Sequence, residues 1–265
     1  MKQPGSFRDP AGFMFTKDSV LYRQINQAGQ ADYDLSVSSG LVADLVQAGL
    51  LVAHTEVGGA GFGKDSNRYK IIRPQLVPFV SYPYEWTFVQ LKSAALTTLA
   101  VLKQAIKHGM ILKDASAYNI QFIGNEPVFI DTLSFATYQA GEPWEGYKQF
   151  CEHFIAPLAL AHYTSANILT LQQANIDGIA LDLAVRLLPK KARWQRGLLT
   201  HLYWHNAAQK KYQPGGEALA QKPKQRKMSR LALEGLIASL ERTVKKLSPP
   251  KVKTQWGDYY SFTNY

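Results

Sequence analysis

Two aspartates and an asparagine near the middle of the chain constrain its fold more than any other feature. Asp114 is followed five residues later by Asn119, and Asp131 comes directly after the short apolar run 128–130. A loop can bring the first two side chains together, and a hairpin with its turn at residues 124–127 can return the third to them. Three oxygen-bearing side chains would then converge on one point.

Each of these residues also has a purely structural interpretation. Asp114 and Asn119 are common turn residues, and an aspartate such as Asp131 often caps the end of a strand. Turn chemistry alone does not require a long helix, a loop, a hairpin and a closing aspartate in this order, so the arrangement favours a phosphate-binding site.

The first 84 residues predict a small sheet with one helix. Alternating apolar residues indicate strands, and apolar residues three to five positions apart indicate a helix, although Gly40 weakens it. The expected elements are strands at 12–15, 19–25, 51–54 and 68–72 and a helix at 35–51.

The rest of the chain predicts helices around the Asp114 loop. A stripe from Phe88 to Ile106 indicates a long amphipathic helix that stops at Gly109. Polar residues 213–229 indicate a linker. Further helices are expected at 144–160, 178–188, 197–211 and 231–247. We therefore divide the chain into a small lobe and hinge (1–84), a helical lobe (85–212), and a basic linker, helix and aromatic tail (213–265).

This order of elements resembles the protein-kinase-like superfamily, nearer its aminoglycoside-phosphotransferase branch than the eukaryotic protein kinases. The resemblance implies a bilobed α+β fold, with a small antiparallel sheet-plus-helix lobe and a larger helical lobe. It also implies that ATP and Mg²⁺ bind in the cleft between the lobes, and that phosphate is transferred to a hydroxyl group of an unknown substrate.

The resemblance assigns roles to residues of the Asp114 loop and its hairpin. Asp114 matches the catalytic base, and Lys113 stands where an arginine usually precedes that base. Asn119 and Asp131 match the two metal ligands.

In the small lobe and hinge, the resemblance implies nucleotide-binding roles for four residues. Arg23 takes the place of the lysine that grips the phosphates, or is an ordinary charge at the edge of the sheet. Asp44 is a candidate partner for Arg23, although an exposed helix charge is the favoured interpretation of Asp44. Tyr82 and Tyr84 would lie against the adenine ring, or would simply pack between the lobes.

The chain also departs from the family pattern. Leu112 replaces a histidine, Thr132-Leu133 replaces Phe-Gly after the metal-binding aspartate, and no glycine-rich loop opens the sheet. The segment 58–65 almost fits a phosphate-binding loop, but it ends in Asp65 instead of Ser or Thr. These departures favour a second hypothesis, a kinase-like module with little or no catalysis.

Five runs of residues resemble the N-terminal portion of bacterial proteins catalogued as class I SAM-dependent methyltransferases. The runs are 6–10, 22–24, 81–86, 112–122 and 256–265. This resemblance implies a methyltransferase domain after Tyr265, which the kinase-like module would serve, and hence a truncated chain. No acidic-x-Gly-x-Gly loop follows a strand here, so we do not expect this chain to bind SAM.

Charge and composition indicate the remaining partners. The net charge is +10, and basic residues dominate the segment 190–230, which suggests either a nucleic-acid-binding surface or a solvated linker and helix face. Apolar runs are too short to predict a membrane span. The single cysteine, Cys151, predicts a reducing, cytoplasmic location.

Overall fold

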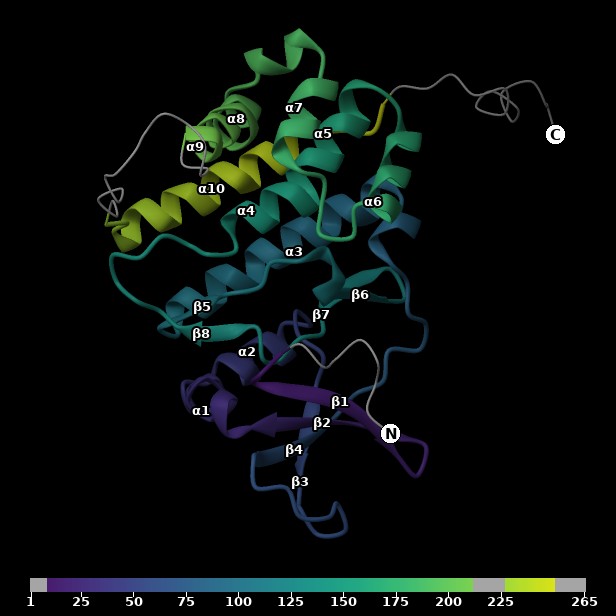
Figure 1. Cartoon of the computed structure of the whole chain (residues 1–265), viewed down its shortest axis with the longest axis vertical. Coiled ribbons are helices and arrows are strands. Elements are labelled where there is room, and N and C mark those ends of the chain that lie inside the picture. Colours follow the sequence, from purple (N-terminus) through teal and green to yellow (C-terminus); the bar gives the residue numbers. More distant parts are fainter. Residues whose placement is uncertain (1–8, 212–226, 251–265) are drawn as a thin grey trace, which may run out of the picture.

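A computed structural model describes residues 9–211 and 227–250 of the chain, which form two lobes of unequal size (Figure 1). The small lobe holds a four-stranded antiparallel sheet and two short helices, and the larger lobe is mainly helical. The α+β class predicted from the sequence is confirmed, and the sheet-containing lobe precedes the helical lobe in the chain, as predicted.

The small sheet is built from two hairpins. Its strands are β1 (Gly12–Lys17), β2 (Val20–Asn26), β3 (His54–Val57) and β4 (Arg68–Pro74), in the spatial order β1-β2-β4-β3. Asp18 and Ser19 join β1 to β2 with φ angles of 49° and 61°. Positive φ at both central residues of a two-residue turn matches the right-handed twist of the strands.

The single helix predicted at 35–51 is wrong, because two helices occupy this region. They are α1 (Gln30–Ser38) and α2 (Leu41–Gln47). Gly40 separates them with a φ of 84°, a left-handed conformation that glycine adopts without steric cost. The break lets α2 take a direction different from α1, and this changes the surroundings of Asp44.

The long helix α3 (Phe88–Lys107) confirms the helix predicted from the apolar stripe. Thr87 and Gln90 form a reciprocal capping box at its N-terminus, and Gly109 follows its C-terminus with a φ of 72°. The buried face includes Leu91, Leu99 and Leu102, which lie in the core of the large lobe.

Short strands connect α3 to the rest of the large lobe. They are β5 (Met110–Leu112), β6 (Ile120–Ile123), β7 (Glu126–Phe129) and β8 (Phe135–Thr137). β6 pairs with β7 in the predicted hairpin, and β5 pairs with β8. Phe129 also forms two backbone hydrogen bonds with the small lobe. Its N–H donates to the Leu50 carbonyl and its carbonyl accepts from the Val52 N–H, both at 2.9 Å.

The helical regions expected after residue 140 are present, although several are broken by tighter or wider turns. The α-helices are α4 (Tyr147–Phe150), α5 (Ala156–Tyr163), α6 (Leu171–Ala174), α7 (Leu181–Leu187), α8 (Arg196–Leu198), α9 (His205–Lys211) and α10 (Arg230–Lys246). Among the described residues, no helix combines the length and apolarity needed to cross a bilayer.

Helix α10 packs into the large lobe, although we grouped its residues with the segment beyond that lobe. Its inner face carries Leu233, Ile237, Leu240 and Val244, all at most 1 % exposed. α10 contacts α3 and α8. The Lys92 ammonium group of α3 donates to the carbonyl oxygens of Lys245, in the last turn of α10, and of Leu247. The helix is therefore part of the same core as α3.

This packing predicts different effects for two leucines of α10. Replacing the fully buried Leu240 by alanine should lower the free energy of unfolding by about 2–5 kcal/mol, because it leaves a cavity. Leu231 lies on the same helix with 78 % of its surface exposed, so Leu231→Ala should change the stability by less than about 0.5 kcal/mol. Chemical denaturation measures both, and equal effects would contradict the packing.

Candidate functional site

A cleft of about 790 Å³ lies between the two lobes. Apolar and polar side chains both line it, and both lobes contribute residues of each kind. The apolar lining includes Met14, Leu21, Val52, Leu76, Val77, Val80, Ile130 and Leu133, and the polar lining includes Asp9, Arg23, Lys113, Asp114, Asn119, Asp131 and Ser134. The structure thus brings Arg23 and the three residues of the Asp-Asn-Asp pattern to one cavity.

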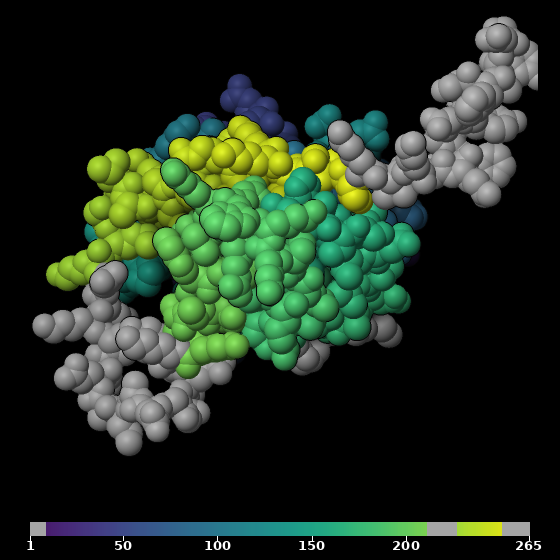
Figure 2. Space-filling model, turned by 90° about the horizontal axis from the view of Figure 1, so that it is seen from above, coloured from purple at the N-terminus to yellow at the C-terminus, as the bar shows by residue number. Residues whose placement is uncertain are grey.

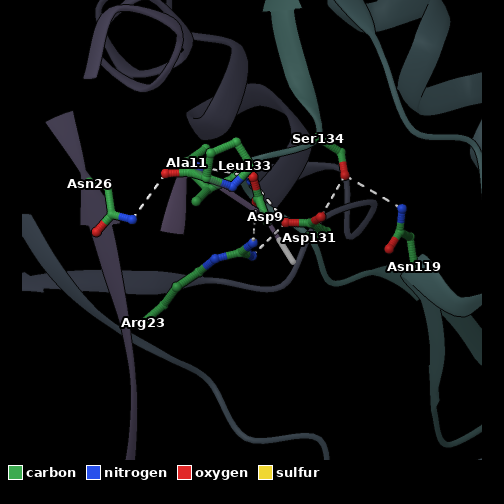
Figure 3. Close-up of polar contacts among 9 residues, drawn as sticks. Asp9, Ala11, Arg23, Asn26, Asn119, Asp131, Leu133 and Ser134 are labelled. Carbon is green, nitrogen blue, oxygen red and sulfur yellow. Dashed lines mark hydrogen bonds and ion pairs between the residues drawn. The ribbon is translucent and has the colours of Figure 1, made fainter. Parts of the chain in front are cut away.

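Asp131 is the most heavily bonded group in the cleft (Figure 3). Its Oδ1 accepts from Arg23 Nη1 at 2.5 Å and from the Leu133 N–H at 3.0 Å, and its Oδ2 accepts from the Ser134 hydroxyl at 2.6 Å. Burial alone would raise the pKa of Asp131, but the Arg23 charge and these hydrogen bonds outweigh burial and lower the pKa below its usual value. The carboxylate is therefore held in its charged form.

Arg23 reaches Asp131 from strand β2 of the small lobe. Its side chain is only 10 % exposed, and Nη2 lies 3.7 Å from the carboxylate of Asp9. The buried Nε atom has no hydrogen-bond partner within the described residues. Arg23 therefore lies in the cleft, as its alternation with Leu21 predicts, and retains one donor that the described protein groups do not satisfy.

Asn119 and Asp114 are joined through the turn that separates them. The Asn119 side-chain nitrogen lies 3.4 Å from the backbone oxygen of Asp114 and 3.4 Å from the Ser134 hydroxyl, while Asp114 Oδ1 accepts from the Ser116 N–H at 2.9 Å. The Asn119 carbonyl accepts from the Ile130 N–H at 2.8 Å, which ties the turn to the end of β7. Ser134 thus connects the side chains of Asn119 and Asp131 (Figure 3).

The loop that carries Asp114 is fixed by bonds on both of its sides. The Lys113 N–H donates to the Ser134 carbonyl at 2.8 Å, and the Ala115 N–H donates to Gln149 Oε1 at 2.7 Å. The indole nitrogen of Trp144 donates to the Leu112 carbonyl at 2.6 Å. The Asp114 side chain is thus presented from a backbone whose position does not depend on a ligand.

Tyr82 and Tyr84 do not line the cleft, contrary to the prediction that they lie against an adenine ring. The turn Pro83–Glu85 stacks the two rings on each other, with their centroids 5.4 Å apart, and Tyr82 also contacts Tyr118. Residues 74–77 and 80 of the connecting segment line the cleft in their place.

Asp44 is not the partner of Arg23, so the pairing considered from the sequence is wrong and the favoured alternative, an exposed helix charge, fits the structure. Its carboxylate lies 2.9 Å from His108 Nε2 at the end of α3, and its side chain is 56 % exposed. The break at Gly40 redirects α2, so Asp44 lies at the surface instead of under the sheet. The ion partners of Arg23 are Asp131 and Asp9.

Sequence reasoning missed two residues of this site. Ser134 follows Asp131 by three residues, a spacing that lets its hydroxyl return to the carboxylate in a tight turn. Asp9 accepts from the Ala11 N–H at 2.9 Å, a short-range turn pattern. Its place beside Arg23 depends on the tertiary fold, so no local signal indicated it.

The side-chain oxygens of Asn119 and Asp131 are suitable ligands for a magnesium ion, but their present hydrogen bonds limit the fit. Carboxylate and amide oxygens are the protein ligands that Mg²⁺ prefers, with phosphate oxygens and water completing the shell. In the part of the chain that the structure describes, no three His, Cys, Asp or Glu side chains form a metal-binding group. Both Asp131 oxygens already accept hydrogen bonds, so an ion would have to replace some of them.

The loop 58–65, which almost fits a phosphate-binding loop, lies elsewhere. It connects β3 to β4 and contributes no residue to the cleft lining. Arg68 and Lys17 donate hydrogen bonds to its backbone carbonyl oxygens, at Phe62 and Gly61 respectively. Its carbonyl oxygens therefore bind basic side chains of the sheet.

Comparison with known proteins gives two similarities. No family model matches the chain. It is 32 % identical over 199 residues to the nodulation protein NoeA of Rhizobium meliloti (strain 1021), and the match covers 75 % of this chain but only 41 % of that protein. The structure of vaccinia related kinase 3 is similar with a TM-score of 0.41 and 13 % identity, over 93 % of this chain and 87 % of that one.

The bonds around Asp131 predict a stability that depends on pH. Asp131→Asn should lower the free energy of unfolding by roughly 1–3 kcal/mol at pH 7, because it removes the charge that Arg23 faces. Since the folded pKa is lowered, this stabilisation is complete above the unfolded pKa of about 3.9. It is lost as the pH falls from there through the folded value.

A surface ion pair provides the control for this measurement. Asp182 pairs with Arg186 at 3.0 Å on exposed α7, so Asp182→Asn should change stability by less than about 1 kcal/mol. Urea denaturation of the three proteins at several pH values makes the comparison. A difference between wild type and Asp131→Asn that stays constant or grows at acidic pH would contradict the prediction.

Proposed function

We propose that the chain is a phosphotransferase domain that binds Mg-ATP in the cleft and transfers phosphate to the hydroxyl group of an acceptor. One observation carries the proposal: Arg23, the Asp114–Asn119 loop and Asp131, which are three separate parts of the chain, line one cavity large enough for a nucleotide. Phosphoryl transfer needs a cationic group on the phosphates, a base for the acceptor hydroxyl and ligands for a metal ion, and these residue types can supply all three.

The two kinds of lining fit the two ends of a nucleotide. The apolar side chains of Met14, Leu21 and Val52 would contact the base, near the backbone of the connecting segment 74–77. Arg23 would bind phosphate oxygens, since its Nε–H is buried and without a partner in the described residues. Arginine presents several donors in a plane and suits such oxygens.

The acidic residues would serve the transfer itself. Asn119 and Asp131 would hold Mg²⁺, which when bound neutralises charge on the phosphates. Asp114 would accept the proton of the acceptor hydroxyl, because its loop presents it to the same cavity. Lys113 lines the cavity beside it and adds positive charge near the transferred group.

A second candidate function is a kinase-like module with little or no catalysis. The ion pair between Arg23 and Asp131 favours it, because the pair occupies both the expected phosphate clamp and the expected metal ligand. Such a module would bind a nucleotide or substrate for another domain. Because this chain spans less than half the length of NoeA, the methyltransferase domain implied by the sequence remains a candidate for that role.

A thermal-shift titration with three variants tests the proposal. Mg-ATP should raise the melting temperature, because a ligand that binds only the folded state stabilises it. Asp114→Asn should keep this shift and lose ATP turnover, measured as slow ADP release with water as acceptor. Asp131→Asn should lose the magnesium-dependent part of the shift, and Asp44→Asn, outside the cleft, should behave as wild type.

The outcomes separate the two candidates. No shift with Mg-ATP or Mg-GTP at millimolar concentration would refute nucleotide binding altogether. A shift without turnover in the wild type would favour the non-catalytic module. Turnover that is equal in wild type and Asp114→Asn would exclude Asp114 as the base.

A further inference from the structure

Two tryptophans at the outer end of the helical lobe are unusually exposed. Trp194 has 88 % of its surface exposed and Trp204 has 61 %. Tryptophan is on average highly buried, because its ring is the largest apolar surface that a side chain offers. Two such rings on one part of the surface indicate a place where another molecule binds.

The fold brings these two residues to neighbouring positions. Trp194 is the last residue of the 3₁₀-helical segment Lys190–Trp194, and Trp204 is the last residue of the π-helical segment Leu199–Trp204. The residues directly before them touch, since the guanidinium carbon of Arg193 lies 5.0 Å from the centre of the Tyr203 ring. Successive Cα atoms are only about 3.8 Å apart, so this contact places the two tryptophans on adjoining segments.

This surface lies at the end of the lobe farthest from the small sheet (Figure 1). Figure 2 looks onto that end, where the green segments before α9 lie beside yellow α10. None of the residues that line the interlobe cleft belongs to it. A ligand here would therefore bind independently of the proposed nucleotide site.

The charge around the tryptophans is positive and uncompensated. Residues 183–216 contain seven lysines and arginines and no aspartate or glutamate. One of the seven, Arg186, pairs with Asp182, which lies just before this stretch. Five exposed cations of this stretch form no ion pair with a described carboxylate. They are Lys190, Lys191, Arg193, Arg196 and Lys210. A partner that brings regularly spaced negative charges would satisfy them.

We propose that this surface, made of Trp194, Trp204 and the five cations of the same stretch that form no described ion pair, binds single-stranded nucleic acid. The cations would contact the phosphates, and the exposed indole rings would stack on unpaired bases. A double helix hides the faces of its bases, so it would use the cations alone. A membrane surface would need a wider apolar face, whereas the two tryptophans lie in a stretch of the chain rich in cations.

Fluorescence anisotropy with the full chain tests this proposal. Labelled oligouridine and oligothymidine of about 16 nucleotides serve as probes, at roughly 50 to 200 mM salt. Single strands should bind more tightly than a duplex of equal length. The affinity should fall with salt, with a logarithmic slope of about −0.7 for each phosphate that a cation neutralises.

Two kinds of variant separate stacking from charge. Trp194→Ala and Trp204→Ala should each weaken binding about fivefold or more with the salt slope unchanged. Arg193→Gln combined with Arg196→Gln should make the slope shallower by about 1.4. All four side chains are exposed, so the melting temperature should stay near that of the wild type. Phe79→Ala, at 76 % exposure on the segment between the lobes, is the matched aromatic control and should bind normally.

Three results would overturn the proposal. They are the absence of binding at the lowest salt, equal affinities of the wild type and both tryptophan variants, and duplex binding as tight as single-strand binding. Tryptophan-dependent binding to vesicles of anionic phospholipid, with no binding to either oligonucleotide, would assign the surface to a membrane instead.

Discussion

The ion pair between Arg23 and Asp131 is the contact on which the arrangement of the cleft depends. It joins a strand of the small sheet to the loop after β7, residues that are 108 positions apart in the chain. A buried charge is costly unless it is paired and hydrogen-bonded, and Asp131 is held by Arg23, Ser134 and the Leu133 N–H together. Because Ser134 also meets Asn119, the same network sets the position of the Asn119 side chain.

Under the proposed function, this network would make nucleotide binding a competition inside the protein. Phosphate would compete with Asp131 for Arg23, and a metal ion would compete with Arg23 for Asp131. A magnesium-bound triphosphate would replace both halves of the pair at once, since it would supply an anion to one partner and a cation to the other. Either component alone would leave one buried charge without compensation, so the geometry favours the complex over free nucleotide or free metal.

The sequence predicted the parts of this site that depend on local spacing. The Asp114 turn, the hairpin and the end of α3 follow from residues close to one another, as does the face of β2 that carries Arg23. The errors lie where tertiary contacts decide. Nothing near Gly40 showed that it would adopt a left-handed conformation and turn Asp44 toward His108, and nothing near Tyr82 showed that it would stack on Tyr84. Asp9 joins Arg23 only because the strands fold beside each other.

The backbone bonds of Phe129 have a mechanical consequence. The lobes are connected covalently through residues 75–87 and non-covalently at several places. Besides the Phe129 bonds to Leu50 and Val52, these include the contacts of Asp44 with His108 and of Arg23 with Asp131. The attachment at Phe129 opposes relative movement of the lobes close to Asp131. Asp131 lies two residues beyond one attachment and so has a short lever arm, whereas the far edge of the sheet at β1 has a long one. Rocking of the lobes would therefore widen the mouth of the cleft much more than its floor.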